Sequence, residues 1–419
     1  MKPNLVISCP ATSRSGYGDH SRDLIRSLIG MNKYDVKILD QKWGACGRNA
    51  LGDKDTELSS RIITAMDGQP DIWIQVTIPQ EFQPVGKYNI GITAGIETDI
   101  CSAPWIQGMN RMDYCIVPSK HSKEAFEASI YNENDERGNP IGKLKLETKT
   151  DVLFEGLDIT KFYKGTEDKF DLSDIKEDFC YLFVGHWLNG DFMHDRKDVG
   201  GMIRTFLETF KNTQSKNQPA LILKTSSANF SVKDKAEMLK RIKHIRATID
   251  SHTVPNVYLI HGELTEKEMN GLYNHSKVKA MLSFTHGEGF GRPLLEFSVT
   301  GKPVLASAWS GHVDFLEEHG IPLAGEMKEV HKTVQHKDII IQGSKWFYVD
   351  YGYANSAIKQ VWKDYKKAIA KSRKQTQYVK DNFTIDIMNK EFEQLMNDNV
   401  PSFEIKIPTL DDVKVASVK

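Results

Sequence analysis

Short runs of β-branched and aromatic residues alternate with amphipathic, helix-like stretches along most of the chain. This alternation is typical of βαβ units, in which helices join and cover parallel strands. In the first half, helical patterns appear at 20–29 and 120–128, and a polar excursion at 131–149 precedes the last strand. The strands expected in this half are 4–8, 35–39, 71–76, 88–93, 114–117 and 150–154. An α/β fold with a doubly wound parallel sheet is therefore predicted.

The same rhythm restarts after a charged connector at 161–177 and turns helical beyond residue 351, at 358–371 and 386–396. The strands expected here are 180–184, 220–224, 257–261, 280–283 and 303–306. A second doubly wound sheet follows, with a ligand cleft where the carboxyl ends of both sheets face each other. We divide the chain into Rossmann-like domains at 1–165 and 166–365, C-terminal helices at 366–400 that pack back on the first domain, and a tail at 401–419.

Length and composition restrict the class of protein. The 419 residues suit two domains, and 40% hydrophobic and 26% charged residues with a net charge of −1 are ordinary for a globular protein. This balance gives no overall attraction to nucleic acids or anionic membranes. The five cysteines are widely spaced without a Cys-x-x-Cys pair, so neither a disulfide framework nor a zinc site is indicated. Without a signal peptide pattern or an apolar run of ~20 residues, we expect a cytoplasmic protein with no transmembrane segment.

The most informative segment is HGEGFGRPLLE at 286–296, which comes just after a short apolar strand. Backbone N–H groups of such a strand-to-helix turn suit a phosphate or sugar hydroxyls. Pro293 falls in the first helical turn, where its missing N–H costs nothing. Glu288 and Glu296 would then line one end of a cleft, where carboxylates can bind hydroxyls and stabilise an oxocarbenium-like transition state. Taken alone, this spacing is better explained by a loop residue at 288 and a helix-dipole partner at 296.

Together with GKPVLAS at 301–307, this segment resembles the E-x7-E donor motif of retaining GT-B glycosyltransferases of the group 1, family 4 type. The resemblance implies two Rossmann-like domains that face a cleft, and transfer from a nucleotide sugar with retention of configuration. It implies that Glu288 approaches the donor sugar and Glu296 the ribose. The amides implied at the sugar hydroxyls and phosphates are Gly289, Phe290 and Gly291.

The resemblance covers most of the chain. YLFVG, which ends at Gly185, resembles the strand that opens the donor domain, and Arg196-Lys197 resembles the basic pair that neutralises the donor diphosphate. A diphosphate leaving group needs positive charge where its own charge grows. The catalytic residues implied are therefore Glu288, Lys197 and Arg196. The sequence departs from the family pattern at His186, in a longer loop, and by lacking a glycine directly after Lys197, which bears on Arg196 more than on Lys197. The alternative is that both cations are solvated residues at a helix start.

A second Gly-rich segment, SRSGYGDH at 13–20, lies between the first strand and the first helix. Glycines there let the backbone approach a ligand closely, although they also suit a tight turn. The segment resembles the first Gly-rich loop of the family, which implies donor contacts for Gly16 and Gly18 and acceptor contacts for Tyr17 and His20. Ser21 stands where a dinucleotide motif needs its third glycine, which disfavours a nicotinamide-dependent oxidoreductase.

Other strings resemble the family at strand ends that face the cleft, including TAGIETD at 93–99 and FEGLD at 154–158. Glu97 and Asp99 could contact an acceptor, and a helix cap explains them as well. Lys224 and Ser310-Gly311 match donor-cleft positions of related enzymes, and each also has an ordinary structural explanation.

We expect a hexosyl- or pentosyltransferase whose co-substrate is a UDP- or GDP-linked sugar, with no cofactor and no catalytic metal. The alternatives are a GT-B nucleotide-sugar epimerase and a binder without catalysis; both motif glutamates and Lys197 favour catalysis.

The SRSGYGDHSRD opening resembles glycosyltransferases of tailed phages, some of which modify hydroxylated pyrimidines of phage DNA. A polysaccharide, a lipid-linked sugar or a small metabolite competes as acceptor. A DNA acceptor needs a basic rim, for which the candidates are Arg14, Arg22, Arg26, Lys42, Arg48, Lys120, Lys123, Arg137, Lys143 and Lys145.

Overall fold

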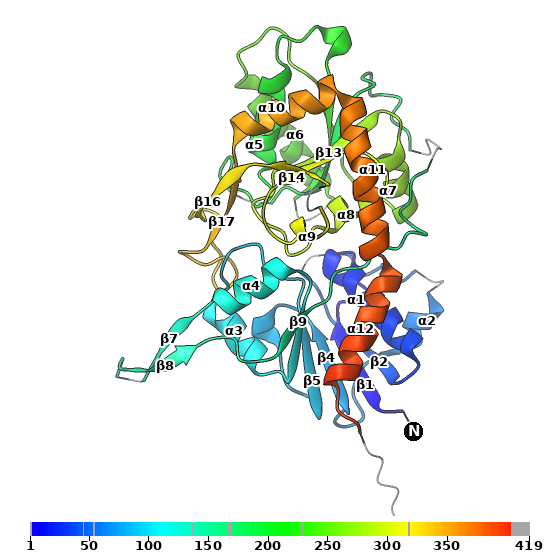
Figure 1. Ribbon diagram of the computed structural model, residues 1–419, viewed down its shortest axis with the longest axis vertical. Coiled ribbons are helices and arrows are strands. Elements are labelled where there is room, and N and C mark those ends of the chain that lie inside the picture. The colour runs from blue at the N-terminus through cyan, green and yellow to red at the C-terminus, as the bar shows by residue number, and fades with distance from the viewer. Residues whose placement is uncertain are drawn as a thin grey trace, which may run out of the picture.

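The chain forms two α/β lobes that follow one another along the long axis of the molecule (Figure 1). The computed structural model describes residues 2–44, 46–52, 55–135, 137–165, 170–188, 190–227, 230–316 and 319–403. The N-lobe is the first sheet with helices α1 to α4 and α12, and the C-lobe is the second sheet with helices α5 to α11. Two doubly wound parallel sheets, predicted from the sequence, are confirmed.

The N-lobe sheet has seven parallel strands in the order β3-β2-β1-β4-β5-β6-β9. Its strands are β1 (Asn4–Cys9), β2 (Asp35–Asp40), β3 (Ile62–Ile63), β4 (Ile72–Val76), β5 (Tyr88–Ile92), β6 (Tyr114–Val117) and β9 (Thr150–Val152). Its helices are α1 (Gly16–Met31), α2 (Thr56–Ser59), α3 (Ala103–Asn110) and α4 (Lys120–Ala128), with a 3-10 turn at Pro79–Glu81. Every residue of β4 is buried, as expected for a strand covered on both faces.

The C-lobe sheet has six parallel strands in the order β12-β11-β10-β13-β14-β15. Its strands are β10 (Cys180–His186), β11 (Ala220–Ser226), β12 (Val257–Ile260), β13 (Val278–Ser283), β14 (Val304–Ser307) and β15 (Ile321–Leu323). Its helices are α5 (Val199–Phe210), α6 (Val232–Ala247), α7 (Glu266–Asn274), α8 (Arg292–Ser298), α9 (Val313–Leu316), α10 (Tyr351–Lys363) and α11 (Tyr365–Asn382). The strand order reverses between β10 and β13, which is where such a sheet offers a ligand crevice.

The last two helices run along one side of the molecule from the C-lobe to the N-lobe (Figure 1). α11 packs on α8 and α9, and α12 (Ile385–Asn399) packs on α1. The Leu157 N–H donates to Phe383 O at 2.8 Å, and the Ile385 N–H donates to Leu157 O at 2.8 Å, which fixes the crossing point. The helical run expected at 358–371 is divided at Asp364, whose side chain accepts from the Lys367 N–H and caps α11.

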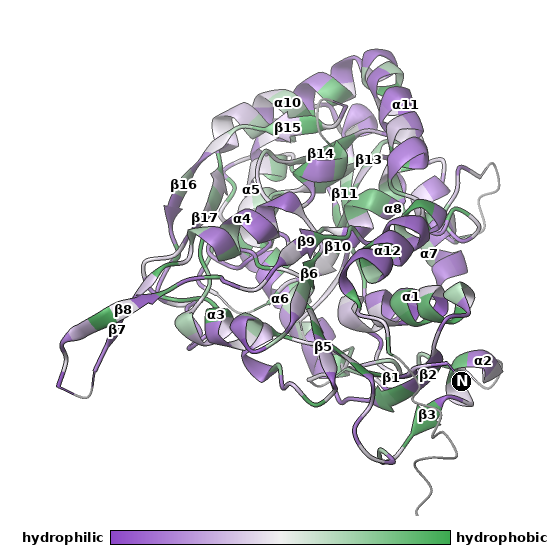
Figure 2. Cartoon of the chain, turned by 60° about the horizontal axis from the view of Figure 1, so that its bottom comes forward, coloured by the Kyte–Doolittle hydropathy of each residue, from purple (hydrophilic) through white to green (hydrophobic). Residues whose placement is uncertain are grey.

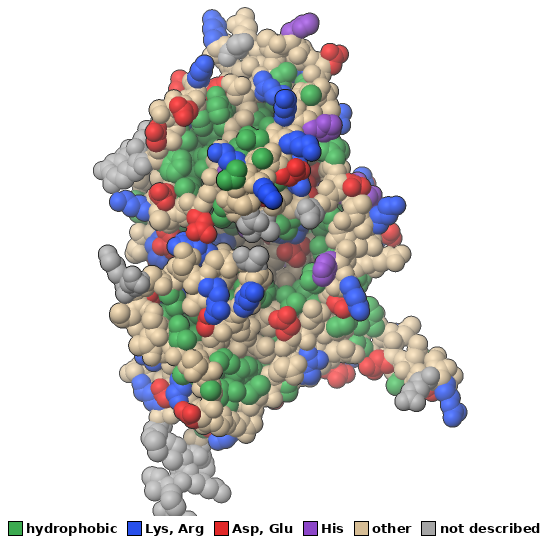
Figure 3. Space-filling model, turned by 180° about the vertical axis from the view of Figure 1, so that it is seen from behind, with side chains coloured by type: hydrophobic (Ala, Val, Ile, Leu, Met, Phe, Trp, Pro, Cys, Tyr) green, Lys and Arg blue, Asp and Glu red, His purple; other side chains and the backbone are tan. Residues whose placement is uncertain are grey.

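Two antiparallel hairpins were not foreseen. β7 (Tyr131–Asn134) and β8 (Pro140–Leu144) form an arm that stands away from the N-lobe in Figures 1 and 3, in the segment expected to be an exposed excursion. β16 (Gly325–Glu329) and β17 (Lys345–Val349) extend the C-lobe toward the N-lobe.

The hydrophobic residues gather on the sheets. Figure 2 shows β1 and β10 as hydrophobic and α11 as mostly hydrophilic, and the residues of β1 after Asn4 are all buried. Within the described residues, no helix combines the length and the apolar character that a bilayer span requires.

Candidate active site between the lobes

The loop between β10 and α5 brings Arg196 and Lys197 to the carboxyl edge of the C-lobe sheet. Asp198 ends this loop and caps α5, because its carboxylate accepts from the Gly201 N–H at 3.1 Å. The Tyr351 hydroxyl donates to the same carboxylate at 2.6 Å. The Arg196 carbonyl accepts from the His286 N–H at 2.8 Å and ties this loop to the next one. The positions of both basic residues are therefore fixed by the backbone.

The loop between β13 and α8 carries Glu288. Its N–H donates to Ser310 Oγ at 2.9 Å, and its carbonyl accepts from the Gly311 N–H at 2.9 Å. Ser310 has φ 82°, a left-handed conformation that residues other than glycine seldom adopt. The loop after β14 thus holds the Glu288 backbone from both sides. Gly291, at φ 96°, then turns the chain into α8, whose second residue is Pro293.

The side chains of Glu288, Lys197 and Arg196 form one ionic cluster. Glu288 accepts a hydrogen bond from the Lys197 ammonium through one carboxylate oxygen, and its other oxygen lies 3.3 Å from Arg196 Nη1. Arg196 Nη1 also lies 3.4 Å from the Glu97 carboxylate of the N-lobe. Glu288 and Lys197 are only 6% and 8% exposed. The structure therefore brings together four residues predicted from distant parts of the sequence.

This cluster favours an ionised Glu288. Burial alone would raise the pKa of Glu288, but the adjacent Lys197 and Arg196 charges outweigh it and lower the pKa to about 2. Burial opposes the charge of Arg196, whereas Glu97 and Glu288 together raise its pKa. Glu288 is thus an anion across the neutral range, and so it is not a general acid in this state.

The two lobes contact each other next to this cluster, at the glycines on either side of Glu288. The Gly289 carbonyl accepts from Ser119 Oγ of the N-lobe at 2.7 Å. A Cβ on Gly289 would lie 2.0 Å from Ala94 O, and a Cβ on Gly287 would lie 1.9 Å from Glu97 O. Only glycine permits such backbone contacts. The loop at 287–289 is therefore shaped to the N-lobe segment at 94–97.

Glu296 lies on α8, one turn after Arg292, and its side chain is largely buried. Its carboxylate accepts from the Tyr273 hydroxyl at 3.0 Å and lies 3.5 Å from Arg292 Nε. The Arg292 guanidinium also forms ion pairs with two carboxylates of the N-lobe: Nη2 lies 2.8 Å from Asp23 Oδ2, and Nη1 lies 3.7 Å from Glu155 Oε2. Burial raises the pKa of Glu296 and of Glu155 to about 7, although Arg292 opposes the shift. Sequence reasoning missed Arg292, Asp23 and Glu155 as members of a site, because only the fold brings them together.

The first Gly-rich loop lies at the start of α1. Ser15 caps the helix by accepting from the Gly18 N–H at 3.1 Å. A Cβ on Gly18 would lie 2.1 Å from Ser13 O, whereas Gly16 is exposed with open space around it. The amides of Gly16 and Tyr17 precede Asp19, whose N–H donates to the Ser15 carbonyl at 2.9 Å and begins the intrahelical bonds, so they can serve a ligand. The loop approaches the C-lobe through Arg14, whose Nε lies 3.4 Å from Glu263.

The acceptor-side candidates have mixed environments. The Tyr17 hydroxyl lies 3.0 Å from Thr93 Oγ1, and the Tyr17 ring packs against Trp43 with centroids 4.1 Å apart. His20 is buried, which lowers its pKa to about 4. Asp99 is engaged by β17, because its carboxylate accepts from the Lys345 N–H at 2.6 Å and its own N–H donates to Lys345 O at 2.9 Å.

The remaining donor-side candidates lie around the C-lobe edge. The Phe290 side chain is buried against Phe315, so only its backbone is available to a ligand. A Cβ on Gly185 would lie 3.1 Å from Phe183 Cζ and in ordinary contact, at 3.4 Å, with Lys197 Cε. Lys224 lies on β11 with its ammonium 5.1 Å from the centre of the Phe230 ring.

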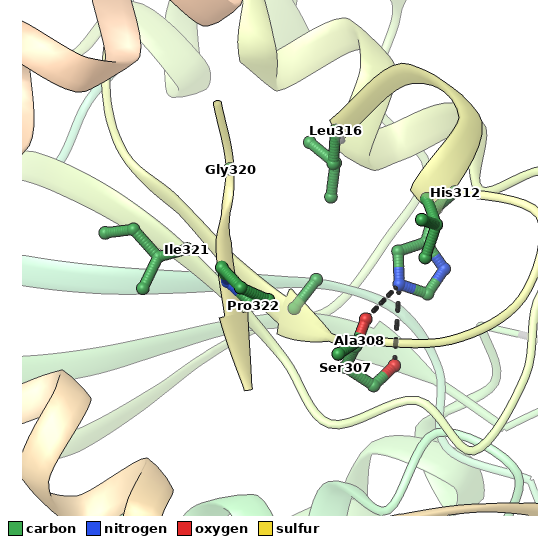
Figure 4. Close-up of a pocket in the computed structure, with 9 residues that line it drawn as sticks. Ser307, Ala308, His312, Leu316, Gly320, Ile321 and Pro322 are labelled. Carbon is green, nitrogen blue, oxygen red and sulfur yellow. Dashed lines mark hydrogen bonds between the residues drawn. The ribbon is translucent and has the colours of Figure 1, made fainter. Parts of the chain in front are cut away.

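The surface is hollowed between the lobes on the face shown in Figure 3. A separate cavity of about 70 Å³ lies between β14, α9 and β15, and His312 forms part of its wall (Figure 4). His312 Nε2 is 2.7 Å from Ser307 O and donates to it. This cavity is smaller than the ~300 Å³ at which ligand pockets begin. In the part of the chain that the structure describes, no group of three His, Cys, Asp or Glu side chains could hold a metal ion.

Comparison with known proteins identifies the fold. No protein-family model and no curated protein sequence matches the chain. Among solved structures, sucrose-phosphate synthase from Thermosynechococcus elongatus matches with a TM-score of 0.61 and 13% identity, over 95% of this chain and 99% of that one. Anabaena HepE in complex with UDP-glucose matches with a TM-score of 0.58 and 13% identity, over 94% and 100%. A trehalose-6-phosphate synthase matches with a TM-score of 0.60 and 8% identity, over 96% and 100%. The chain therefore has the GT-B fold.

Proposed function

We propose that this protein is a glycosyltransferase that takes a sugar from a UDP- or GDP-linked donor. The observation that carries the proposal is the buried cluster of Glu288, Lys197 and Arg196 at the junction of the lobes. It lies at the carboxyl edge of a parallel sheet, where ligands bind in such folds. Support also comes from the structural neighbours, since HepE was solved with UDP-glucose.

The proposed roles follow from charge and position. Lys197 and Arg196 neutralise the departing diphosphate, because positive charge there gains interaction energy as the glycosidic bond breaks. Glu288 approaches the donor sugar, and Glu296 approaches the ribose. The amides of Gly289, Phe290 and Gly291, with Gly16 and Gly18 of the N-lobe, approach the phosphates and sugar hydroxyls. We propose that transfer retains the anomeric configuration and that no metal takes part.

The proposal requires Lys197 to change partner. In the structure its ammonium is engaged by Glu288, so a donor diphosphate must compete with that carboxylate or share the lysine with it. Arg196 links Glu288 to Glu97 of the N-lobe and can remain between them. The ion pair therefore holds the lysine in place before the donor arrives, which reduces the reorganisation needed during reaction.

For the acceptor, we propose a hydroxylated pyrimidine of DNA, and we keep a polysaccharide, a lipid-linked sugar and a small metabolite as competitors. The basic residues of the N-lobe support a polyanionic acceptor, but several already have carboxylate partners. Arg22 pairs with Asp19, Arg26 with Asp55 and Arg48 with Asp40. Within the described residues, no ion pair is found for Lys42, next to Trp43, so a DNA acceptor depends most on rim residues of this kind. Location in the cytoplasm remains a prediction.

The test uses a panel of radiolabelled UDP- and GDP-sugars with DNA that contains hydroxymethylated pyrimidines, with polysaccharide and with no acceptor. Transfer or hydrolysis that Glu288→Gln abolishes supports the proposed function. Interconversion of the donor sugar without transfer supports the epimerase alternative, and binding without turnover supports the non-catalytic one. Mass gain of a single acceptor identifies the substrate class.

A further inference from the structure

Arg292 is the first residue of α8 and lies where the lobes meet. From there its guanidinium reaches Asp23 on α1 at 2.8 Å and Glu155, just after β9, at 3.7 Å. On its own helix it lies 3.5 Å from Glu296. Arg292 thus connects the helix that carries Glu296, the second motif glutamate, to two carboxylates of the other lobe.

The cluster is buried. The side chains of Arg292, Asp23, Glu155 and Glu296 are 18%, 12%, 7% and 13% exposed. Removing these charges from water costs more than a surface pair would, and apolar packing of the same volume could hold an interface as well. One guanidinium faces three carboxylates, so the cluster carries excess negative charge. Such an arrangement is a poor way to gain stability, but it makes the contact between lobes sensitive to charge.

Other polar groups face the same point from neighbouring elements: Asp19 and His20 on α1, and Tyr273 and Glu266 on α7. Within the described residues, Arg292 Nη1 and His20 Nδ1 are buried without a hydrogen-bond partner. The Glu155 carboxylate at 3.7 Å is too far from Arg292 Nη1 for a hydrogen bond. A small rearrangement of the lobes therefore changes which acceptors this guanidinium engages.

We propose that Arg292 is a positioning residue that clamps α8, and with it Glu296, to the N-lobe when the lobes close. When the lobes separate, Arg292 loses Asp23 and Glu155 and keeps Glu296, four residues along its own helix. The environment of Glu296 therefore differs between the open and the closed state. The inference rests on the proposed function only for the role of Glu296 at the donor. The contact of Arg292 with the N-lobe does not depend on that function.

The chemistry of the side chain explains why this residue is an arginine. Its planar guanidinium carries five N–H donors in a fixed fork and can face carboxylates from three elements at once. A lysine keeps the charge but offers a single, compact ammonium. Arg292→Lys therefore tests the fork, and Asp23→Asn tests the charge across the lobes with almost no change of shape. Arg26→Gln is the matched control, because it removes an ion pair of α1 with Asp55 that stays within the N-lobe.

The experiment is done without donor or acceptor. Small-angle scattering gives the radius of gyration, and hydrogen exchange follows the facing loops at 93–97 and 286–291. We expect Arg292→Lys and Asp23→Asn to be less compact than the wild type, with exchange in these loops about tenfold faster or more, while Arg26→Gln behaves as the wild type. If Arg292→Lys fails to fold, Asp23→Asn decides alone. Wild-type compactness and exchange in Asp23→Asn would overturn the clamp.

A second measurement separates a clamp from a merely structural ion pair. With the donor found in the panel, a clamp predicts that Asp23→Asn lowers kcat/KM although Asp23 is assigned no donor contact. The rate of the variant should therefore fall most, relative to the wild type, at low donor concentration, where closure limits binding. Equal kcat/KM in the wild type and Asp23→Asn would contradict the link to Glu296. If the wild type transfers no sugar at all, the proposed function fails, and the scattering comparison still decides the clamp.

Discussion

The Lys197 ammonium donates a hydrogen bond to the Glu288 carboxylate, and both side chains are almost completely buried. The two residues come from different loops of the C-lobe, one before α5 and one before α8. Because neither charge has free access to water, each depends on the other and on Arg196. The proposed catalytic role of this pair is therefore tied to the stability of the lobe, and variants of either residue must be assayed for both.

Lys197→Ala should lower kcat and not only raise KM. A cation on the departing diphosphate stabilises the transition state more than the ground state, and loss of such a group costs ~10²-fold or more. The variant should also unfold more easily, by about 3–5 kcal/mol, because Glu288 loses a buried partner. Steady-state kinetics and urea unfolding measure the two effects. Lys211→Ala, at the partly exposed end of α5, is the control and should change neither.

Arg196→Ala run in parallel tests which neighbour serves the diphosphate. Full turnover of Lys197→Ala at saturating donor, together with loss in Arg196→Ala, would assign the role to Arg196. Full turnover of both would place the diphosphate elsewhere.

Glu288→Gln should change how the protein responds to acid. The lowered pKa of Glu288, about 2 in the folded state, means that ionised Glu288 contributes stability above its unfolded value near 4.5. That contribution is lost as the pH falls from there through 2. Gln cannot ionise, so the fall in Tm between pH 4.5 and 2 should be smaller in the variant. Parallel melting curves for the two proteins across this range would show that Glu288 is not paired in solution.

The sequence predicts the sheets well because their strands are short, apolar runs separated by amphipathic helices. Eleven of the thirteen strands in the two sheets lie where the pattern placed them; β3 and β15, with two and three residues, were missed. The hairpins were missed for a different reason. β7 and β8 are almost entirely exposed, so no alternation of buried and exposed residues marks them.

The candidate site was predictable only in part. Glu288, Lys197 and Arg196 were chosen from motifs, and the structure brings them into contact. The Arg292 cluster could not be predicted, because Asp23, Glu155 and Arg292 are far apart in the sequence and no motif assigns them to one site. Asp99 shows the converse. Its motif pointed to an acceptor, but its contacts with Lys345 are explained by β17, a strand that was not foreseen.

Gly289→Ala should hinder the approach of the lobes while each lobe remains folded. The added Cβ would lie 2.0 Å from Ala94 O, a backbone atom that cannot move aside alone. Scattering should therefore show a less compact molecule, and turnover should fall. Gly30→Ala is the control, because a Cβ there meets nothing within 4 Å. Unchanged compactness of Gly289→Ala would mean that the contact between 289 and 94 is not formed in solution.

Glu296→Ala should weaken binding of free UDP or GDP, since a carboxylate on ribose hydroxyls provides charge-assisted hydrogen bonds. Titration calorimetry measures the affinity directly. Glu393→Gln, which removes an exposed pair with Lys33 within the N-lobe, is the comparison and should bind as the wild type does. Equal affinity of Glu296→Ala and the wild type would remove Glu296 from the nucleotide site.

Closure of the lobes should weaken as the pH rises toward neutrality. Burial raises the pKa of Glu155 and Glu296 to about 7 in the closed state, despite Arg292. Opening exposes both carboxyls to water and returns their pKa values toward the ordinary value near ~4.3. The closed state therefore binds more protons. The stability that these protons give the closed state is complete below the open-state pKa of ~4.3. It is lost as the pH rises through about 7, the pKa in the closed state.

The radius of gyration, measured without ligand from pH 5 to pH 8, should accordingly increase with pH in the wild type. Glu155→Gln cannot lose a proton, so it should stay compact over more of this range and show a smaller increase. Glu393→Gln, which removes an exposed pair with Lys33 inside the N-lobe, should follow the wild type. A radius that falls as the pH rises would contradict proton-linked closure, because it requires the open state to bind more protons than the closed state. A radius that is constant from pH 5 to pH 8 in both the wild type and Glu155→Gln would also count against the prediction.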